Sequence, residues 1–337
     1  MEERYDSIDL LRGVAILIML SANAWPYLYP FEYCPFLVRI IFSSAAPIFI
    51  FLSGYSIHLS LKSGKSTNQL ISRGIQIFTI GFMIDTLIWN ILPVVNFDVL
   101  YLIGLSTITI TLSRKYILTL LLVITSAFII ARLYISHLYN FNIPDLDLLV
   151  YHPDINLTNI IKRILWDGWF PVLPWTIIAI AGFIIAENRS YLQKFKLPFI
   201  LAGISLLLIY AYLLPQSSIQ PHRNRYTELF YPLSGFFTIY VMALLSICIF
   251  IHFHKFSKFT PIKKLGKVSL SIYLSHTIII RFILPLFMSN ENNFSWIIFA
   301  MGLFVLYLLI FLATFTLNKL RSRIKQSSTY LAFVLGL

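Results

Sequence analysis

Residues 120–130 read LLLVITSAFII, and this stretch decides the fold class of the chain. It is apolar on every side of a helix, as a helix that faces lipid or is fully buried should be. It belongs to a longer apolar run, 116–136, and a bilayer crossing needs about 20 mostly apolar residues. The stretch therefore predicts a transmembrane helix.

The composition of the whole chain also indicates a membrane protein. Of its 337 residues, 58% are hydrophobic and only 12% are charged, whereas a soluble domain carries about 25% charged residues. Because so few polar groups cannot cover a surface that faces water, much of the surface must face lipid. We predict an all-α fold, a polytopic helical bundle in the membrane.

Further apolar runs of similar length occur along the chain, and together they predict about ten transmembrane helices. The run 98–113 is the shortest. The first run, 8–28, is expected to be retained, because the segment before it is more acidic than basic, whereas a secretory leader begins with positive charge. The predicted spans are 8–28, 37–60, 70–91, 98–113, 116–136, 165–187, 197–214, 231–252, 265–288 and 294–317.

The distribution of basic residues orients the chain in the membrane. With a cytoplasmic N-terminus, the inner segments hold most of the 26 lysines and arginines, as the positive-inside rule requires. Both ends are then predicted to be cytoplasmic, and the net charge of +12 is a signal of topology rather than of nucleic-acid binding. We predict a transmembrane domain, 1–320, followed by a short basic cytoplasmic tail, 321–337.

Three polar residues of the first span are candidates for function, because ionisable groups inside a membrane are costly. Asp9 and Arg12 lie three residues apart and can pair on one helix face. Asn23 follows Arg12 by eleven residues, almost three turns, so both side chains project in the same direction. This stripe would lead from the cytoplasmic face to mid-membrane. The structural alternative is an ion pair that fixes the helix and an asparagine that bonds to a neighbouring helix.

The ninth predicted span carries a polar face of its own. Ser269, Tyr273 and His276 fall at positions i, i+4 and i+7 of an apolar segment. His276 near mid-membrane could act as a general base. It could equally be a structural histidine with satisfied hydrogen bonds, and the sequence leaves both interpretations open.

Other spans contribute further candidates. Ser53 and Gly54 permit the close approach of another helix, and Arg39 could bind a carboxylate or phosphate or extend to the interface. Asp85 in the third span and Asp167 at the start of the sixth are ionisable.

Several motifs are missing from the sequence. It contains no phosphate-binding glycine loop, no zinc-ligand spacing and no GxSxG elbow. Cys34 and Cys248 provide neither a disulfide framework nor a metal-ligand spacing. We therefore expect no resident metal.

Five sequence blocks follow one another along residues 4–320. They are RYDSIDLLRGVAI (4–16, continued by Met19 and Asn23), APIFIFLSG (46–54), DVLYLIGLS (98–106), FPVLPW (170–175) and LGKVSLSIYLSH (265–276). In this order they resemble the heparan-α-glucosaminide N-acetyltransferase catalytic-domain family. That family includes a lysosomal enzyme and prokaryotic relatives, and it belongs with the membrane acyltransferases that modify cell-surface glycans.

The resemblance implies a multi-pass acyltransferase of the plasma membrane. An acyl group, acetyl in the first instance, would pass from cytoplasmic acyl-CoA to an amine or hydroxyl of a sugar on the outer side. Acyl-CoA, a glycan acceptor and the bilayer would be the partners, with no nucleic acid, and a homo-oligomer is left open. For such a reaction, the candidate catalytic residues are Asn23, His276 and Asp9, and the candidate coenzyme-binding residues are Arg12, Arg39, Ser269 and Tyr273.

The chain departs from this family at one position that matters for catalysis. Members like the lysosomal enzyme place a histidine shortly after the asparagine, as acyl carrier or base. Residues 24–35 of this chain contain none, and Cys34 is the only nucleophile-like side chain there. His276, His152 or His222 could substitute, or the activity has been lost.

Two other functions compete with acyl transfer. A carrier or lipid-linked-glycan transporter could line a pathway with the same polar groups, although transporters often show paired halves and no internal repeat is visible in the sequence. A catalytically inert relative could serve as a membrane assembly partner.

Overall fold

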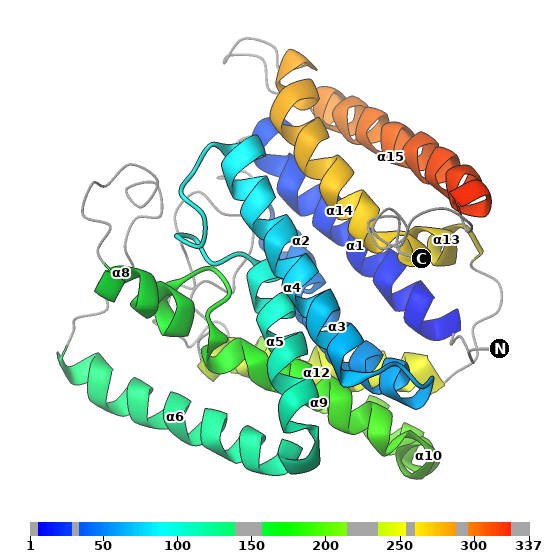
Figure 1. Cartoon of the computed structure of the whole chain (residues 1–337). Coiled ribbons are helices and arrows are strands. Elements are labelled where there is room, and N and C mark those ends of the chain that lie inside the picture. Colours follow the sequence, from blue (N-terminus) through cyan, green and yellow to red (C-terminus); the bar gives the residue numbers. More distant parts are fainter. Residues whose placement is uncertain are drawn as a thin grey trace.

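The structure is a computed structural model. It describes residues 6–28, 34–138, 157–213, 235–253, 260–287 and 296–324. All regular structure in these residues is helical, which confirms the predicted fold class. Figure 1 shows the helices gathered in one bundle, with α6 (Ile117–Leu138) at one edge and α15 (Trp296–Ile324) at the opposite edge. α1 (Asp6–Leu28) contacts both α14 (Ser269–Ile278) and α3 (Ala45–Lys62).

The other helices connect these elements in chain order. They are α2 (Phe36–Phe42), α4 (Thr67–Ile84), η2 (Asp85–Trp89), α5 (Val99–Ser113), η3 (Arg114–Tyr116), α8 (Leu157–Lys162), η4 (Arg163–Asp167), α9 (Val172–Glu187), α10 (Arg189–Leu192), η5 (Gln193–Phe195), α11 (Lys196–Leu213), α12 (Gly235–Phe253), α13 (Thr260–Lys267), η7 (Ile279–Ile283) and η8 (Leu284–Phe287).

Six helical segments of the described chain are long and apolar enough to cross a membrane. Three shorter apolar helices, Val172–Glu187, Phe237–His252 and Phe299–Ala313, lie at further predicted spans. The fourth and fifth predicted spans form one apolar segment, Val99–Ala131, in which η3 separates α5 from α6. Helices thus lie where the apolar runs predict them, while the number of about ten crossings and the cytoplasmic ends remain predictions.

The predicted span 37–60 is broken in the structure, because α2 and α3 meet at two serines. The Ser43 side chain donates a hydrogen bond to the Arg39 carbonyl at 2.7 Å. The Ser44 side chain donates one to the Ile41 carbonyl at 2.6 Å. Serines that bond back to their own helix bend it, so this segment turns within an otherwise apolar run.

The predicted span 265–288 also differs from the structure. Its first residues belong to α13, which is separated from α14 at the buried Val268. α13 packs along α1 (Figure 1), and Lys263 makes a 2.8 Å ion pair with Asp6 of α1. Lys263 therefore anchors the short helix that precedes the polar face of α14.

Glycines bring the backbones of α3 and α9 into direct contact. A methyl group added at Gly54 of α3 would lie 1.8 Å from the Ala179 carbonyl oxygen of α9. One added at Gly182 of α9 would lie 2.0 Å from the Phe51 carbonyl oxygen of α3. Neither distance leaves room for a side chain, so the predicted close approach of another helix at Gly54 is confirmed.

The same kind of contact joins α1 to α13 and α4 to α5. A methyl group at Gly13 of α1 would lie 2.1 Å from a carbonyl oxygen of α13, and one at Gly266 of α13 would lie 1.9 Å from the Asp9 carbonyl oxygen. Gly74 of α4 and Gly104 of α5 face each other in the third pair. Close backbone approach at small residues is typical of helices that associate within a membrane.

The outward faces of the edge helices are apolar. Leu122 on α6, Leu208 on α11 and Phe304 on α15 have exposed fractions of 67%, 65% and 67%. In water, such a large exposed apolar surface would be a site of association. An apolar outer surface of this kind is therefore expected where the helices face lipid.

We expect Gly54→Ala to destabilise the bundle, because the added methyl forces α3 and α9 apart. Overpacking of this kind costs about 1–3 kcal/mol. The midpoint of thermal unfolding in detergent measures the effect. Gly81→Ala is the matched control, because the nearest atom to its added methyl lies 3.3 Å away. Equal midpoints for the two variants would contradict the tight α3–α9 contact.

Candidate active site

Asn23 and His276 meet where α1 packs against α14. The Asn23 Nδ2 atom lies 3.0 Å from the His276 Nε2 atom. The structure therefore brings together two of the three predicted catalytic residues, although they are far apart in the sequence. A bond from this asparagine to a neighbouring helix was the structural alternative drawn from the sequence, but His276 was not identified there as the partner.

The partners of His276 fit its neutral form. Its Nδ1 atom bonds to the Tyr273 backbone carbonyl oxygen, one turn earlier in α14. Because a carbonyl oxygen can only accept, Nδ1 carries the proton, and Nε2 is left to accept from the Asn23 amide. Both nitrogens are then satisfied by a neutral imidazole. Of the two roles left open for His276, these contacts fit a structural histidine with satisfied hydrogen bonds better than a general base, and they hold Asn23 in place.

Burial differs between the two partners. His276 is 1% exposed, whereas Asn23 is half-buried. A primary amide has two N–H donors, and the bond to His276 uses one of them. One amide N–H of the half-buried Asn23 is therefore held by a buried imidazole.

Tyr273 extends this cluster to the start of α5. Its hydroxyl donates a 2.6 Å hydrogen bond to Asp98 Oδ2, and its ring packs edge-on against the His276 ring with centroids 5.0 Å apart. Asp98 is the N-cap residue of α5, and its Oδ1 accepts from the Val99 N–H at 2.6 Å. Asp98 lies within a sequence block noted above, but its role was missed, because the N-cap pattern alone predicts only a helix start.

A second carboxylate lies in the adjacent helical segment. Asp85 in η2 is 4% exposed and accepts a 2.6 Å hydrogen bond from the Tyr101 hydroxyl. That hydroxyl in turn accepts from the Val94 N–H at 3.2 Å. Asp85 was a sequence candidate, and the structure engages it in an internal bond that holds the η2 segment to α5.

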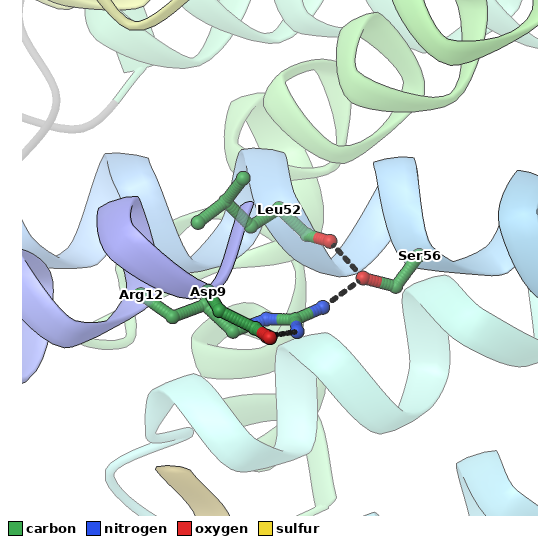
Figure 2. A network of polar contacts seen from close by, with 4 residues as sticks. All are labelled: Asp9, Arg12, Leu52 and Ser56. Atoms are coloured by element: carbon green, nitrogen blue, oxygen red, sulfur yellow. Dashed lines mark hydrogen bonds and ion pairs between the residues drawn. The ribbon is translucent and has the colours of Figure 1, made fainter. Parts of the chain in front are cut away.

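The opposite end of α1 carries the predicted ion pair. The Arg12 Nη1 atom lies 3.4 Å from Asp9 Oδ1, so the pairing of these two residues is confirmed. Figure 2 shows the guanidinium between Asp9 and Ser56 of α3, where its Nη2 donates to the Ser56 hydroxyl. The Ser56 hydroxyl donates to the Leu52 carbonyl at 2.6 Å. The Arg12 side chain is 24% exposed, and that of Asp9 is 2% exposed.

A buried histidine lies at this same end and was passed over in the sequence. His252 of α12 bonds through Nδ1 to the Ser7 hydroxyl and through Nε2 to the Tyr55 hydroxyl, both at 2.7 Å. All three residues are buried, and they join α12, α1 and α3. The sequence gives no sign that a histidine near a predicted helix end joins three helices through hydrogen bonds.

The two polar clusters are distinct sites along α1. Eleven residues separate Arg12 from Asn23, a rise of about 16 Å along a helix. Arg12 bonds to α3, whereas Asn23 bonds to α14. Asp9 therefore lies with Arg12 and not beside Asn23 and His276, because fourteen residues of rigid helix hold it away. The predicted stripe is divided between two neighbours.

The remaining predicted residues are placed as follows. Arg39 is half-buried in α2, and Ser269 is the first residue of α14. Cys34 is buried beside Trp25 and Phe42, which fits a packing role. The side chain of Asp167 and the histidines 152 and 222 lie outside the described residues. Among the described residues, no group of three His, Cys, Asp or Glu side chains is arranged to hold a metal ion.

Comparison with protein families accounts for most of the chain. Residues 4–216 match the family described as "Heparan-alpha-glucosaminide N-acetyltransferase, catalytic". The chain belongs to this family. A second match, to "Protein of unknown function (DUF418)", covers residues 177–322. A comparison with curated proteins finds no match.

The two matches divide the candidate active site of this N-acetyltransferase family member. Asn23, Asp98 and Arg12 lie within the acetyltransferase match, whereas His276 and Tyr273 lie only within the second. The Asn23–His276 contact therefore joins the two matched parts of the chain.

We expect the Asn23–His276 hydrogen bond to couple the two residues energetically. In a double-mutant cycle of Asn23→Ala and His276→Phe, contacting residues should give an interaction energy of about 0.5–3 kcal/mol. Thermal or denaturant unfolding in detergent measures it. The pair Asn188→Ala and His276→Phe is the control, because Asn188 is exposed and bonds to its own helix. Additive effects in the Asn23 cycle would contradict the contact.

Proposed function

We propose that this chain is a plasma-membrane acyltransferase. It moves an acyl group, acetyl in the first instance, from cytoplasmic acyl-CoA to an amine or hydroxyl of a glycan on the outer side. The observation that carries the proposal is the Asn23 amide, half-buried inside the membrane bundle of an acetyltransferase-family chain and oriented by the buried His276.

Asn23 stabilises the transition state of the transfer. Attack on the thioester carbonyl carbon places negative charge on the carbonyl oxygen, and the amide N–H not used by His276 donates to that oxygen. One such preorganised donor is typically worth about 3–4 kcal/mol. His276 acts through Asn23, since it fixes the amide before charge develops.

The acyl group passes to the acceptor in one step. Residues 24–35 contain no histidine to carry it, and Cys34 is buried against aromatic rings. The acceptor nitrogen or oxygen therefore bonds to the carbonyl carbon as the carbon–sulfur bond breaks. Coenzyme A leaves as the thiolate and takes up a proton, and the acceptor loses one.

The donor enters from the end of α1 that carries Arg12. With both chain ends cytoplasmic, Arg12 lies on the inner side among basic loops, which attract a polyanionic coenzyme. The guanidinium is held in place by Asp9 and Ser56 and is partly exposed, so it can contact a phosphate group. Arg39, Ser269 and Tyr273 complete the contacts proposed for the donor.

We expect purified protein in detergent or nanodiscs to release free thiol from acetyl-CoA when methyl α-glucosaminide is added. Asn23→Ala should lower kcat about 10²–10³-fold, as loss of one oxyanion donor does. Arg12→Ala should instead weaken acetyl-CoA binding, measured by calorimetry. Asn188→Ala, the same change at an exposed asparagine, should leave both quantities unchanged.

The same assay separates acyl transfer from the competing functions. A folded wild-type protein that neither binds millimolar acetyl-CoA nor releases thiol contradicts the enzyme proposal. Glycan flux into vesicles without thiol release would then favour a carrier. Neither turnover nor flux would favour an inert assembly partner.

A further inference from the structure

Direct acyl transfer requires a group that accepts the proton lost by the acceptor. His276 is occupied, because its Nε2 lone pair faces the Asn23 amide and its Nδ1 faces the Tyr273 carbonyl. Residues 24–35 supply no histidine. Among the described residues, we therefore examined the polar groups next to the Asn23–His276 contact.

We propose that Asp98 is the general base of the transfer reaction and that the Tyr273 hydroxyl relays the proton to it. This inference rests on the proposed acyl transfer. The acceptor donates its proton to the Tyr273 oxygen while Tyr273 passes its own proton to Asp98 Oδ2. The carbon–nitrogen or carbon–oxygen bond forms as the carbon–sulfur bond breaks, and Asp98 ends as the carboxylic acid.

The distances support this route. The Tyr273 hydroxyl already donates to Asp98 Oδ2 at 2.6 Å, so the second half of the relay is in place. The Tyr273 ring lies against the His276 ring, with centroids 5.0 Å apart, and His276 Nε2 is 3.0 Å from the Asn23 amide. Two adjacent rings thus connect the proposed oxyanion donor to the proposed base.

Exposure separates Asp98 from the neighbouring carboxylate. Asn23, Tyr273 and Asp98 are each half-buried. Asp85 and Tyr101 are 4% and 0% exposed and bond to each other. By residue exposure, the Tyr273–Asp98 pair is therefore the less enclosed of the two hydroxyl–carboxylate pairs.

The position of Asp98 along the membrane also fits the acceptor. Asp98 lies directly before α5, at the end of the segment that connects η2 to α5. In the proposed topology this end of α4 and α5 is the outer one. An outer-side sugar would therefore meet Asp98 first, and acyl-CoA would arrive from the opposite end of α1.

Asp98 also has a structural role, which the test must hold constant. It caps α5 through the Val99 N–H, and asparagine caps helices about as well as aspartate does. In Asp98→Asn the single side-chain oxygen keeps the cap on the Val99 N–H, and the amide NH2 takes the place of Oδ2, where it can donate to the Tyr273 oxygen. The substitution therefore keeps the helix cap and a hydrogen bond to Tyr273, reverses the direction of that bond, and removes the ability to take up a proton.

The experiment measures kcat for thiol release and the Kd for acetyl-CoA in wild type, Asp98→Asn, Tyr273→Phe and Asp85→Asn. We expect Asp98→Asn to lower kcat about 10²–10⁴-fold, the usual contribution of a general base, with unchanged Kd and unfolding midpoint. Tyr273→Phe should lower kcat as well. Asp85→Asn makes the same chemical change in the buried carboxylate and should leave kcat within a few-fold of wild type.

Each outcome decides one question. Wild-type turnover with undiminished kcat in Asp98→Asn overturns the role of Asp98 and leaves the acyl transfer standing. Equal losses of kcat in Asp98→Asn and Asp85→Asn also overturn it, because they indicate a shared structural effect. Absence of thiol release by wild type instead overturns the proposed function, and this inference with it.

Discussion

Backbone contact between helices at glycine is the constraint on which the rest of this structure depends. In lipid, apolar side chains gain little by leaving one apolar environment for another, so helices associate through close packing and polar bonds. Gly13 and Gly266 bring α1 against α13, and Gly54 and Gly182 bring α3 against α9. Because α13 leads directly into α14, the first contact also sets the position of His276 beside Asn23.

Polar groups inside the bundle are gathered at two levels of α1. Near the start of the helix, Arg12 is held by Asp9 and Ser56, and His252 joins three helices. Near its end, Asn23 meets His276. An ionisable group in an apolar bundle is costly without partners, so these bonds stabilise the fold. They also preorganise the groups that the proposed reaction uses.

The family assignment and the departure from the family are consistent with one chemical scheme. The matched acetyltransferase region contains Asn23 but no histidine in the following twelve residues. A direct transfer needs no acyl carrier, but it still needs a proton acceptor. The Tyr273–Asp98 hydrogen bond supplies a candidate proton acceptor, Asp98. From the sequence pattern, this residue is recognisable only as the start of a helix.

The sequence by itself determined the helices and the local pairs. Apolar runs near bilayer length form helices because backbone groups in lipid must bond within their own segment. The ion pair of Asp9 and Arg12 follows from a spacing of three residues. Only the tertiary structure decided the Asn23–His276 and Tyr273–Asp98 contacts, since these join residues of different helices whose packing no local pattern encodes. The structure also showed the breaks at Ser43 and Val268. A hydropathy profile does not register them, because neither a hydrogen bond from serine to the backbone nor burial against neighbouring helices changes the hydropathy of the segment.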